Sequence, residues 1–239
     1  MTKKHIPISL IITNLAILII FIAVAFIYNK SIYTVREIFQ DSDRTCVIID
    51  AGHGGIDGGA VSCSGVSESH FNLAVSLRLN DLMNLLGIDT KMIRSADISV
   101  HTEGKTIAAQ KVSDLRNRVN AVRNTKNAVL ISIHQNHFPD KRYYGAQVFY
   151  NGFDQSKRFA KELQTRFVNT LNPSSNRKAK AAEAVFLLKN INCPGILVEC
   201  GFLSNPQEEA LLKDPEYQKR LCSVIATETV AYINANRTA

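Results

Sequence analysis

Four residues of the sequence have side chains that could work together in a hydrolysis: His53, Glu68, His134 and Glu199. Both histidines and Glu199 follow short apolar runs typical of buried strands, and Glu68 stands at the start of a helical pattern. A catalytic zinc ion takes three nitrogen or oxygen ligands, keeps one position for water, and works with a further carboxylate as base. Two histidines and two glutamates at adjoining strand ends therefore predict a zinc site.

Each of these residues taken alone has an ordinary structural explanation. A single histidine at a strand end is more often a hydrogen-bonded structural residue than a metal ligand. Glu68 alone would favourably interact with the dipole at a helix N-terminus. Glu199 is the most informative of the four, because a carboxylate after an apolar strand is expected to be buried, and burial without a partner is costly. The prediction rests on the combination.

The elements that must position these residues alternate between strands and helices. Apolar runs predict strands at 46–50, 88–94, 128–133, 146–150, 185–188 and 195–198. Apolar stripes predict helices at 67–86, 113–124 and 154–171, a short helix capped by Asn205 with Pro206 at its first position, and a last helix from about Pro215. Ser67 is the expected N-cap and Gly87 the expected C′ residue of the first helix.

This alternation predicts one α/β domain with a mostly parallel central sheet flanked by helices on both faces, preceded by an N-terminal hydrophobic helix. Sites in such sheets form beyond the carboxyl ends of the strands, where His53, His134 and Glu199 are expected. The glycine-rich stretch 52–55 has neither the spacing of a dinucleotide-binding turn nor that of a phosphate-binding loop, so it does not predict nucleotide binding.

Composition narrows the class of protein further. The chain has 239 residues, of which 46% are hydrophobic and 21% charged, which excludes a disordered or low-complexity chain. Its net charge of +7 suits an anionic polymer, but the basic residues are spread out and no recognition motif is present, so nucleic acid is not a predicted partner. The five cysteines form no CxxC pair, which excludes a cysteine-based zinc ribbon and favours core residues.

The N-terminus carries an export or anchor segment. The 22 residues Ile6–Ile27 contain no charge and follow Lys3 and Lys4, and as a helix they would be about 33 Å long, enough to cross a membrane with the rest of the chain outside the cytoplasm. Ala23-Val24-Ala25 could be a signal-peptide cleavage site, but the apolar run continues beyond it, which favours an uncleaved anchor. We therefore divide the chain into a transmembrane anchor or signal segment (1–28), a linker (29–45) and a catalytic domain (46–239).

Four motifs in order along the chain resemble one known family. They are Asp50-Ala-Gly-His-Gly-Gly-Ile-Asp-Gly-Gly-Ala60, Glu68 followed by Phe71-Asn72-Leu73, Ser132-Ile-His134-Gln-Asn136, and Val198-Glu199-Cys-Gly-Phe-Leu-Ser-Asn205. Together they are similar to the zinc-dependent N-acetylmuramoyl-L-alanine amidases of the third amidase type, over essentially all of residues 46–234. With one N-terminal hydrophobic segment and no wall-binding repeats, the chain resembles the short, germination-specific members that act on spore cortex.

The resemblance implies a zinc ion held by His53, Glu68 and His134, with Glu199 as the catalytic glutamate. The bond cut would join the lactyl group of N-acetylmuramic acid to L-Ala of the peptidoglycan stem peptide, in spore cortex maturation and muramic-lactam formation. Arg94, Asp97 and Arg116 match positions where the family often has Arg, Asp and Arg, with either a structural or a substrate-facing role. No long inserted segment blocks the site, so control would come from substrate state, location or a regulatory or targeting protein partner.

Two other functions stay open on the sequence. Another zinc peptidase, such as a carboxypeptidase acting elsewhere on the stem peptide, could use the same residues. A catalytically silent wall-binding protein is the other alternative, although such a protein need not retain all four residues. For the amidase we expect an extracytoplasmic protein, membrane-anchored or secreted, with the forespore intermembrane space as the location of a spore-cortex enzyme.

Overall fold

The computed structural model describes residues 14–15, 17–26 and 44–237 of the chain. It separates into two compact units, Met1–Arg44 and Thr45–Ala239. In the first unit, residues 14–15 and 17–26 are helical and their side chains are exposed. None of the helices formed by the described residues combines the length and the hydropathy that a membrane-spanning helix needs. Much of the predicted anchor segment and residues 29–43 of the linker lie outside the described residues, so these two predictions stay predictions.

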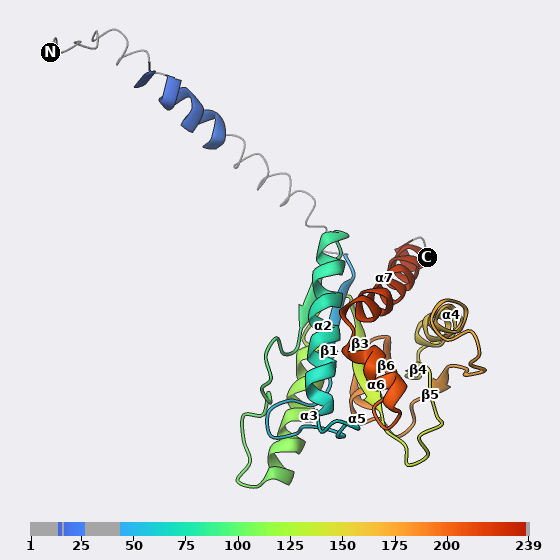
Figure 1. Cartoon of the computed structure of the whole chain (residues 1–239). Coiled ribbons are helices and arrows are strands. Elements are labelled where there is room, and N and C mark those ends of the chain that lie inside the picture. The colour runs from blue at the N-terminus through green and yellow to red at the C-terminus, as the bar shows by residue number, and fades with distance from the viewer. Residues whose placement is uncertain (1–13, 16, 27–43, 238–239) are drawn as a thin grey trace, which may run out of the picture. The chain divides into compact units, whose positions relative to one another are not determined.

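The second unit is built on a sheet of six strands in the order β2-β1-β3-β6-β4-β5 (Figure 1). The strands are β1 (Cys46–Ala51), β2 (Thr90–Met92), β3 (Ala128–Asn136), β4 (Gln147–Tyr150), β5 (Lys180–Ala181) and β6 (Gly195–Phe202). β2, β1, β3 and β6 pair in parallel, whereas β4 is antiparallel to β6 and carries β5 at the edge. The predicted mostly parallel sheet is confirmed.

Helices cover the two faces of this sheet unequally. The described helices of this unit are α2 (Glu68–Leu85), α3 (Ile107–Arg123), α4 (Asp154–Thr170), α5 (Phe186–Asn190), α6 (Pro206–Lys213) and α7 (Pro215–Arg237). Side chains from α2, α4, α6 and α7 form the larger core with one face, for example Leu79, Leu163 and Leu221 against Ile131. Side chains from α3 and α5 form a smaller core with the other face, for example Val119 and Leu188 against Leu130.

Helix ends follow the sequence signals in most places. Asn205 caps α6 as predicted, since its side-chain oxygen accepts hydrogen bonds from the backbone N–H groups of Gln207 and Glu208. Gly87 follows Leu86, the C-cap of α2, and has a positive φ of 73°, which is the backbone conformation that a C′ glycine supplies. Ser67 stands at the N-cap of α2 in an extended conformation, but its side chain makes no capping hydrogen bond.

Two predictions from the apolar pattern are corrected by the structure. Residues 185–188 were expected to form a strand, but Phe186–Asn190 is the short helix α5. Its Leu187 and Leu188 pack on the smaller core, and four apolar residues in a row fit a buried helical turn as well as a strand. The helix expected from 113 begins at Ile107, because the side chain of Thr106 accepts a hydrogen bond from Ala109 N and starts it earlier.

Candidate metal centre

His134 and Glu199 lie side by side at the carboxyl ends of β3 and β6. They are register partners in a parallel pair, so their side chains leave the same face of the sheet, the one covered by α3 and α5. His53 follows the end of β1, where Gly52 N donates a 3.0 Å hydrogen bond to Ile133 O of β3. Three neighbouring strands therefore deliver three of the predicted site residues to one edge.

The backbone around His53 is unusual. His53 has a φ of 59°, a left-handed conformation that costs free energy for a residue with a side chain and that concentrates at functional sites. Gly54 and Asp57 form a tight turn behind it through reciprocal backbone hydrogen bonds of 2.8 and 3.2 Å. This turn brings Asp57 Oδ2 to 2.9 Å from His53 Nδ1, which fixes the ring and leaves His53 Nε2 directed at Glu68, 3.2 Å from Oε2.

Glu68 is held by hydrogen bonds at both carboxylate oxygens. Its Oε2 accepts from Ala60 N at 3.0 Å, and its Oε1 accepts from Gln135 N and from Asn72 Nδ2 at 3.1 Å each. His134 Nδ1 lies 2.9 Å from the same Oε1. Although burial raises the pKa of Glu68, the hydrogen bonds and charges of His134 and His53 outweigh it and hold the pKa well below its usual range. The carboxylate is thus ionised and oriented before any ligand arrives.

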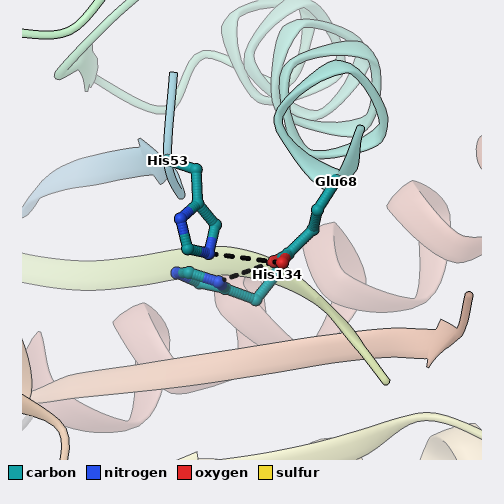
Figure 2. A group of neighbouring side chains, drawn as sticks. All are labelled: His53, Glu68 and His134. Carbon is teal, nitrogen blue, oxygen red and sulfur yellow. Dashed lines mark hydrogen bonds and ion pairs between the residues drawn. The ribbon is translucent and has the colours of Figure 1, made fainter. Parts of the chain in front are cut away.

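Figure 2 shows both imidazole rings directed at the carboxylate of Glu68, with His53 coming from the loop after β1, His134 from β3 and Glu68 from the first turn of α2. One nitrogen or oxygen atom from each residue lies within 4.8 Å of the others, a spacing that suits a shared metal ion. In the protein without metal, burial lowers the pKa of His53, but Glu68 and Asp57 outweigh it and raise the pKa to about 9.

Two glycines make room for this group. A Cβ atom at Gly52 would lie 2.2 Å from His134 Nε2, and one at Gly59 would lie 2.6 Å from Glu68 Oε2 and 2.7 Å from the His53 ring. Any side chain at either position would displace a candidate ligand. Two imidazoles and one carboxylate are a donor set that zinc uses in open catalytic sites, so the residues present fit a zinc ion.

Glu199 differs from Glu68 in having no fixed partner. Its Oε2 is closed off from solvent and makes no hydrogen bond with any described residue. Burial raises its pKa to about 7, with the nearby histidines opposing the rise and Glu68 adding to it. A carboxylate with a pKa near 7 can both accept and return a proton at neutral pH. Glu199 shares a cavity of about 390 Å³ with His53 and His134.

Two buried arginines hold the backbone that carries His53, and the sequence identified only one of them. Arg94 donates to Ala51 O at 2.7 Å and to Gly52 O at 2.8 Å. The sequence leaves open whether Arg94 is structural or faces the substrate, and these hydrogen bonds give it a structural role. Arg118 pairs with Asp50 and Asp114 and donates to His53 O at 2.7 Å.

The family resemblance points to Arg116 and not to Arg118, yet Arg116 is exposed and forms no hydrogen bond or ion pair with a described residue. The helical spacing could have indicated Arg118, because it stands four residues before Val122 and so lies on the same, buried side of α3. Asp97, the third position matched to the family, accepts a hydrogen bond from Gly55 N at 3.1 Å and so supports the same loop.

The fold and this site define a class of protein. The family model for N-acetylmuramoyl-L-alanine amidase matches residues 47–228, and the chain belongs to that family. The predicted family, α/β fold class and amide-hydrolase activity are thereby confirmed.

Individual members of this family, from several bacteria, are similar to this chain over most of its length. The germination-specific N-acetylmuramoyl-L-alanine amidase of Bacillus subtilis is 37% identical over 188 residues, which cover 78% of each chain. The amidase AmiA of Escherichia coli is 26% identical over 229 residues, covering 82% of this chain and 78% of AmiA. Among solved structures, the CwlD amidase from Clostridioides difficile, in complex with the GerS lipoprotein, matches with a TM-score of 0.77 and 36% identity, covering 80% of this chain and all of that one (100%).

Proposed function

We propose that this amidase uses zinc held by His53, Glu68 and His134 to cleave the bond between the lactyl group of N-acetylmuramic acid and L-Ala of the stem peptide, with Glu199 moving the proton. The observation that carries the proposal is the contrast between two carboxylates at one sheet edge. Glu68 is fixed by hydrogen bonds at both oxygens, as a ligand should be, whereas the buried Oε2 of Glu199 has no partner among the described residues.

Bound zinc would supply a Lewis acid that polarises the scissile carbonyl and stabilises the negative charge that develops on its oxygen. The protein does the rest with groups already in place. Glu199 takes a proton from the attacking water and returns it to the nitrogen of the departing L-Ala, so that an amine leaves. Asp57 orients His53 through Nδ1, and Arg118 and Arg94 hold the backbone from Ala51 to His53 against the end of the sheet.

The biological setting follows from the relatives. The germination-specific amidase of Bacillus subtilis matches over most of both chains, which supports action on spore cortex, in the maturation that includes muramic-lactam formation. An enzyme of this kind works outside the cytoplasm, and the uncharged run at 6–27 supports a membrane anchor or export signal. Because the CwlD structure contains a lipoprotein partner, we propose a regulatory or targeting protein partner for this chain as well.

The test measures metal content and products together. The purified full-length protein should bind about one equivalent of zinc, and mass spectrometry of digested peptidoglycan should find free lactyl groups and new L-Ala amines. His134→Ala should lose both zinc and activity. His137→Ala is the matched control, because His137 is exposed three residues later and its side chain makes no hydrogen bond or ion pair with a described residue.

The possible results separate the three functions. Cleavage elsewhere in the stem peptide would identify a carboxypeptidase-like enzyme. A protein that binds zinc and peptidoglycan but releases nothing would be a silent wall-binding protein. Normal zinc content in His134→Ala would show that the ligand assignment is wrong.

A further inference from the structure

A second cavity, of about 590 Å³, lies beside β4 and β5. We name it the basic groove and define it by its lining residues, which come from the loop after β3, the start of β4 and the segment leading into β5: Asp140, Arg142, Tyr143, Tyr144, Gln147, Ser174, Ser175, Asn176, Arg177, Lys178 and Lys180. The proposed amide hydrolysis assigns no role to any of them.

The groove carries an excess of positive charge. Its one lining carboxylate, Asp140, is already engaged by the guanidinium of Arg142 through Nε and Nη2, at 3.0 and 2.7 Å. Lys178 and Lys180 are exposed, and neither side chain forms an ion pair or hydrogen bond with a described residue. Arg177 likewise lies in no ion pair of the described chain. Three cations therefore line this groove and form no ion pair with any described residue.

Arg177 is held in place as a binding group would be. Its guanidinium lies over the ring of Phe202, 4.6 Å from the centroid, and donates to Tyr144 O at 2.8 Å and to Gln147 Oε1 at 3.3 Å. Glu208, an acid whose charge acts on Arg177, is buried and accepts hydrogen bonds from Gly145 N and Phe202 N instead. A cation fixed in this way loses little conformational freedom when it binds an anion.

The register of the strands places the groove next to the catalytic edge. Gln147 of β4 lies directly opposite Glu199 of β6, and Lys180 of β5 lies opposite Phe149 of β4. Residues opposite each other leave the same face of a sheet, so the groove and Glu199 open on one face. Strands are spaced about 4.8 Å apart, which puts β5 about 10 Å from β6.

That distance matches a short peptide. An extended chain advances about 3.3–3.6 Å per residue, so a stem peptide held at its first amide beside Glu199 would reach the groove with its second to fourth residues. Those residues carry the free α- and terminal carboxylates of a stem peptide. We propose that the basic groove binds these carboxylates and so makes the enzyme selective for anionic stem peptides, an inference that rests on the proposed function.

The test reverses charge in the groove without touching the catalytic residues. The full-length double variant Lys178→Glu and Lys180→Glu is compared with Lys157→Glu and Lys161→Glu on α4. The control positions are also exposed and outside any ion pair of the described chain, the change of net charge is the same, and α4 packs on the opposite face of the sheet.

Two soluble muropeptides serve as substrates, identical except that the stem carboxylates are free in one and amidated in the other. On the free acid we expect the groove variant to lose about tenfold in kcat/KM, mostly through KM, because two attractive charges become repulsive. On the amidated substrate, and for the control variant on both, we expect changes within about twofold. Equal losses on both substrates, or none on either, would overturn the proposal.

A binding measurement separates this proposal from the proposed function. Calorimetry with the released stem peptide and the zinc-free full-length protein should show binding that the groove variant loses and the control variant keeps. If the wild-type protein cleaves neither muropeptide but binds the stem peptide, and only the groove variant loses this binding, the proposed function is wrong and the proposed role of the basic groove is supported. If the groove variant instead loses adsorption to phosphate-bearing cell walls while cleaving the free acid normally, the groove binds a phosphate polymer and the proposal is wrong.

Discussion

The two faces of the sheet are built for different tasks. On the face under α2, α4, α6 and α7, strand residues are apolar over most of their length, as Val129, Ile131 and Ile133 of β3 show before the strand reaches Gln135. On the face under α3 and α5, the same strand changes from apolar Leu130 to Ser132 and His134. β1 and β6 repeat the change, with Ile48 followed by Asp50 and Leu197 followed by Glu199.

The difference shows how one sheet can carry both a core and a site. Burying apolar surface on the first face stabilises the fold without constraining chemistry. On the second face, a buried polar group without a hydrogen-bond partner would destabilise the fold through the cost of its desolvation. Most of these groups have partners, as Asp50 has in Arg118 and Ser132. Glu199 is the exception, since its Oε2 is buried with no described partner. Substitutions at Glu199 and in the larger core should therefore separate activity from stability.

The largest expected effect is loss of activity without loss of stability. Glu199→Gln keeps the shape of the side chain and removes its basicity, so kcat should fall about 10²–10⁴-fold. Zinc should stay near one equivalent and the denaturation midpoint at neutral pH should not decrease, since an amide is less costly to bury than a carboxylate. Single-turnover assays, metal analysis and urea denaturation check this. Loss of zinc together with activity would instead make Glu199 a ligand.

Next in size is a polar contact on the site face. Arg118→Met leaves Asp50 buried without its cation, which should lower the free energy of unfolding by about 3–5 kcal/mol. Arg116→Met, two residues away but exposed, should stay within about 0.5 kcal/mol of wild type. Chemical denaturation of both variants measures the difference. If the two variants unfold alike, the interaction of Arg118 with Asp50 does not stabilise the fold and the site face depends less on paired charges than proposed.

A substitution on the core face should affect stability alone. Leu79 of α2 is fully buried in the larger core, and Leu79→Ala should cost about 2–5 kcal/mol of unfolding free energy. Zinc content and kcat/KM per folded molecule should remain within about twofold of wild type. Leu85→Ala is the control, because the side chain of Leu85 is 83% exposed at the end of the same helix. A selective loss of zinc in Leu79→Ala would show that the two faces are coupled.

The sequence predicts the central strands of the sheet better than its short elements. The apolar runs of β1, β3 and β6 predict these strands correctly, and the chemistry at their ends follows from residue type. The apolar run Val185 to Leu188 predicts a strand but belongs to the helix α5, because four residues are too few for their period to distinguish the two structures. β5, a two-residue edge strand, has no apolar run and was not predicted.

Within the site, the sequence could name residues but not the contacts between them. His53, Glu68 and His134 stand out by type and spacing, and the structure brings them together. The role of Asp57 depends on the left-handed backbone at His53, and that of Arg118 on which side of α3 faces the sheet. These are consequences of tertiary packing, which local patterns do not determine.

The smallest expected effect is a pH dependence that belongs to Glu199. In the protein without zinc its pKa is about 7, whereas in the unfolded chain it should be near the ordinary value of 4.5. Between these values the unfolded state releases its proton first, so this group makes the folded state progressively less stable as pH rises through that window. Relative to Glu199→Gln, wild type should therefore lose on the order of 1–3 kcal/mol between pH 4.5 and 8.

Urea denaturation in the presence of a chelator, at several pH values across this range, measures the difference between the two proteins. Other titrating groups, including His53, are present in both wild type and Glu199→Gln, so their contributions to the pH dependence of stability largely cancel in the difference. Adding zinc should shrink the difference, because a nearby cation lowers the pKa of Glu199 and removes part of the cost of its charge. Glu162→Gln, an exposed carboxylate on α4, should run parallel to wild type at every pH. If Glu199→Gln also runs parallel to wild type without zinc, Glu199 is not desolvated in the folded protein, and the site face would then carry no unpaired carboxylate for catalysis.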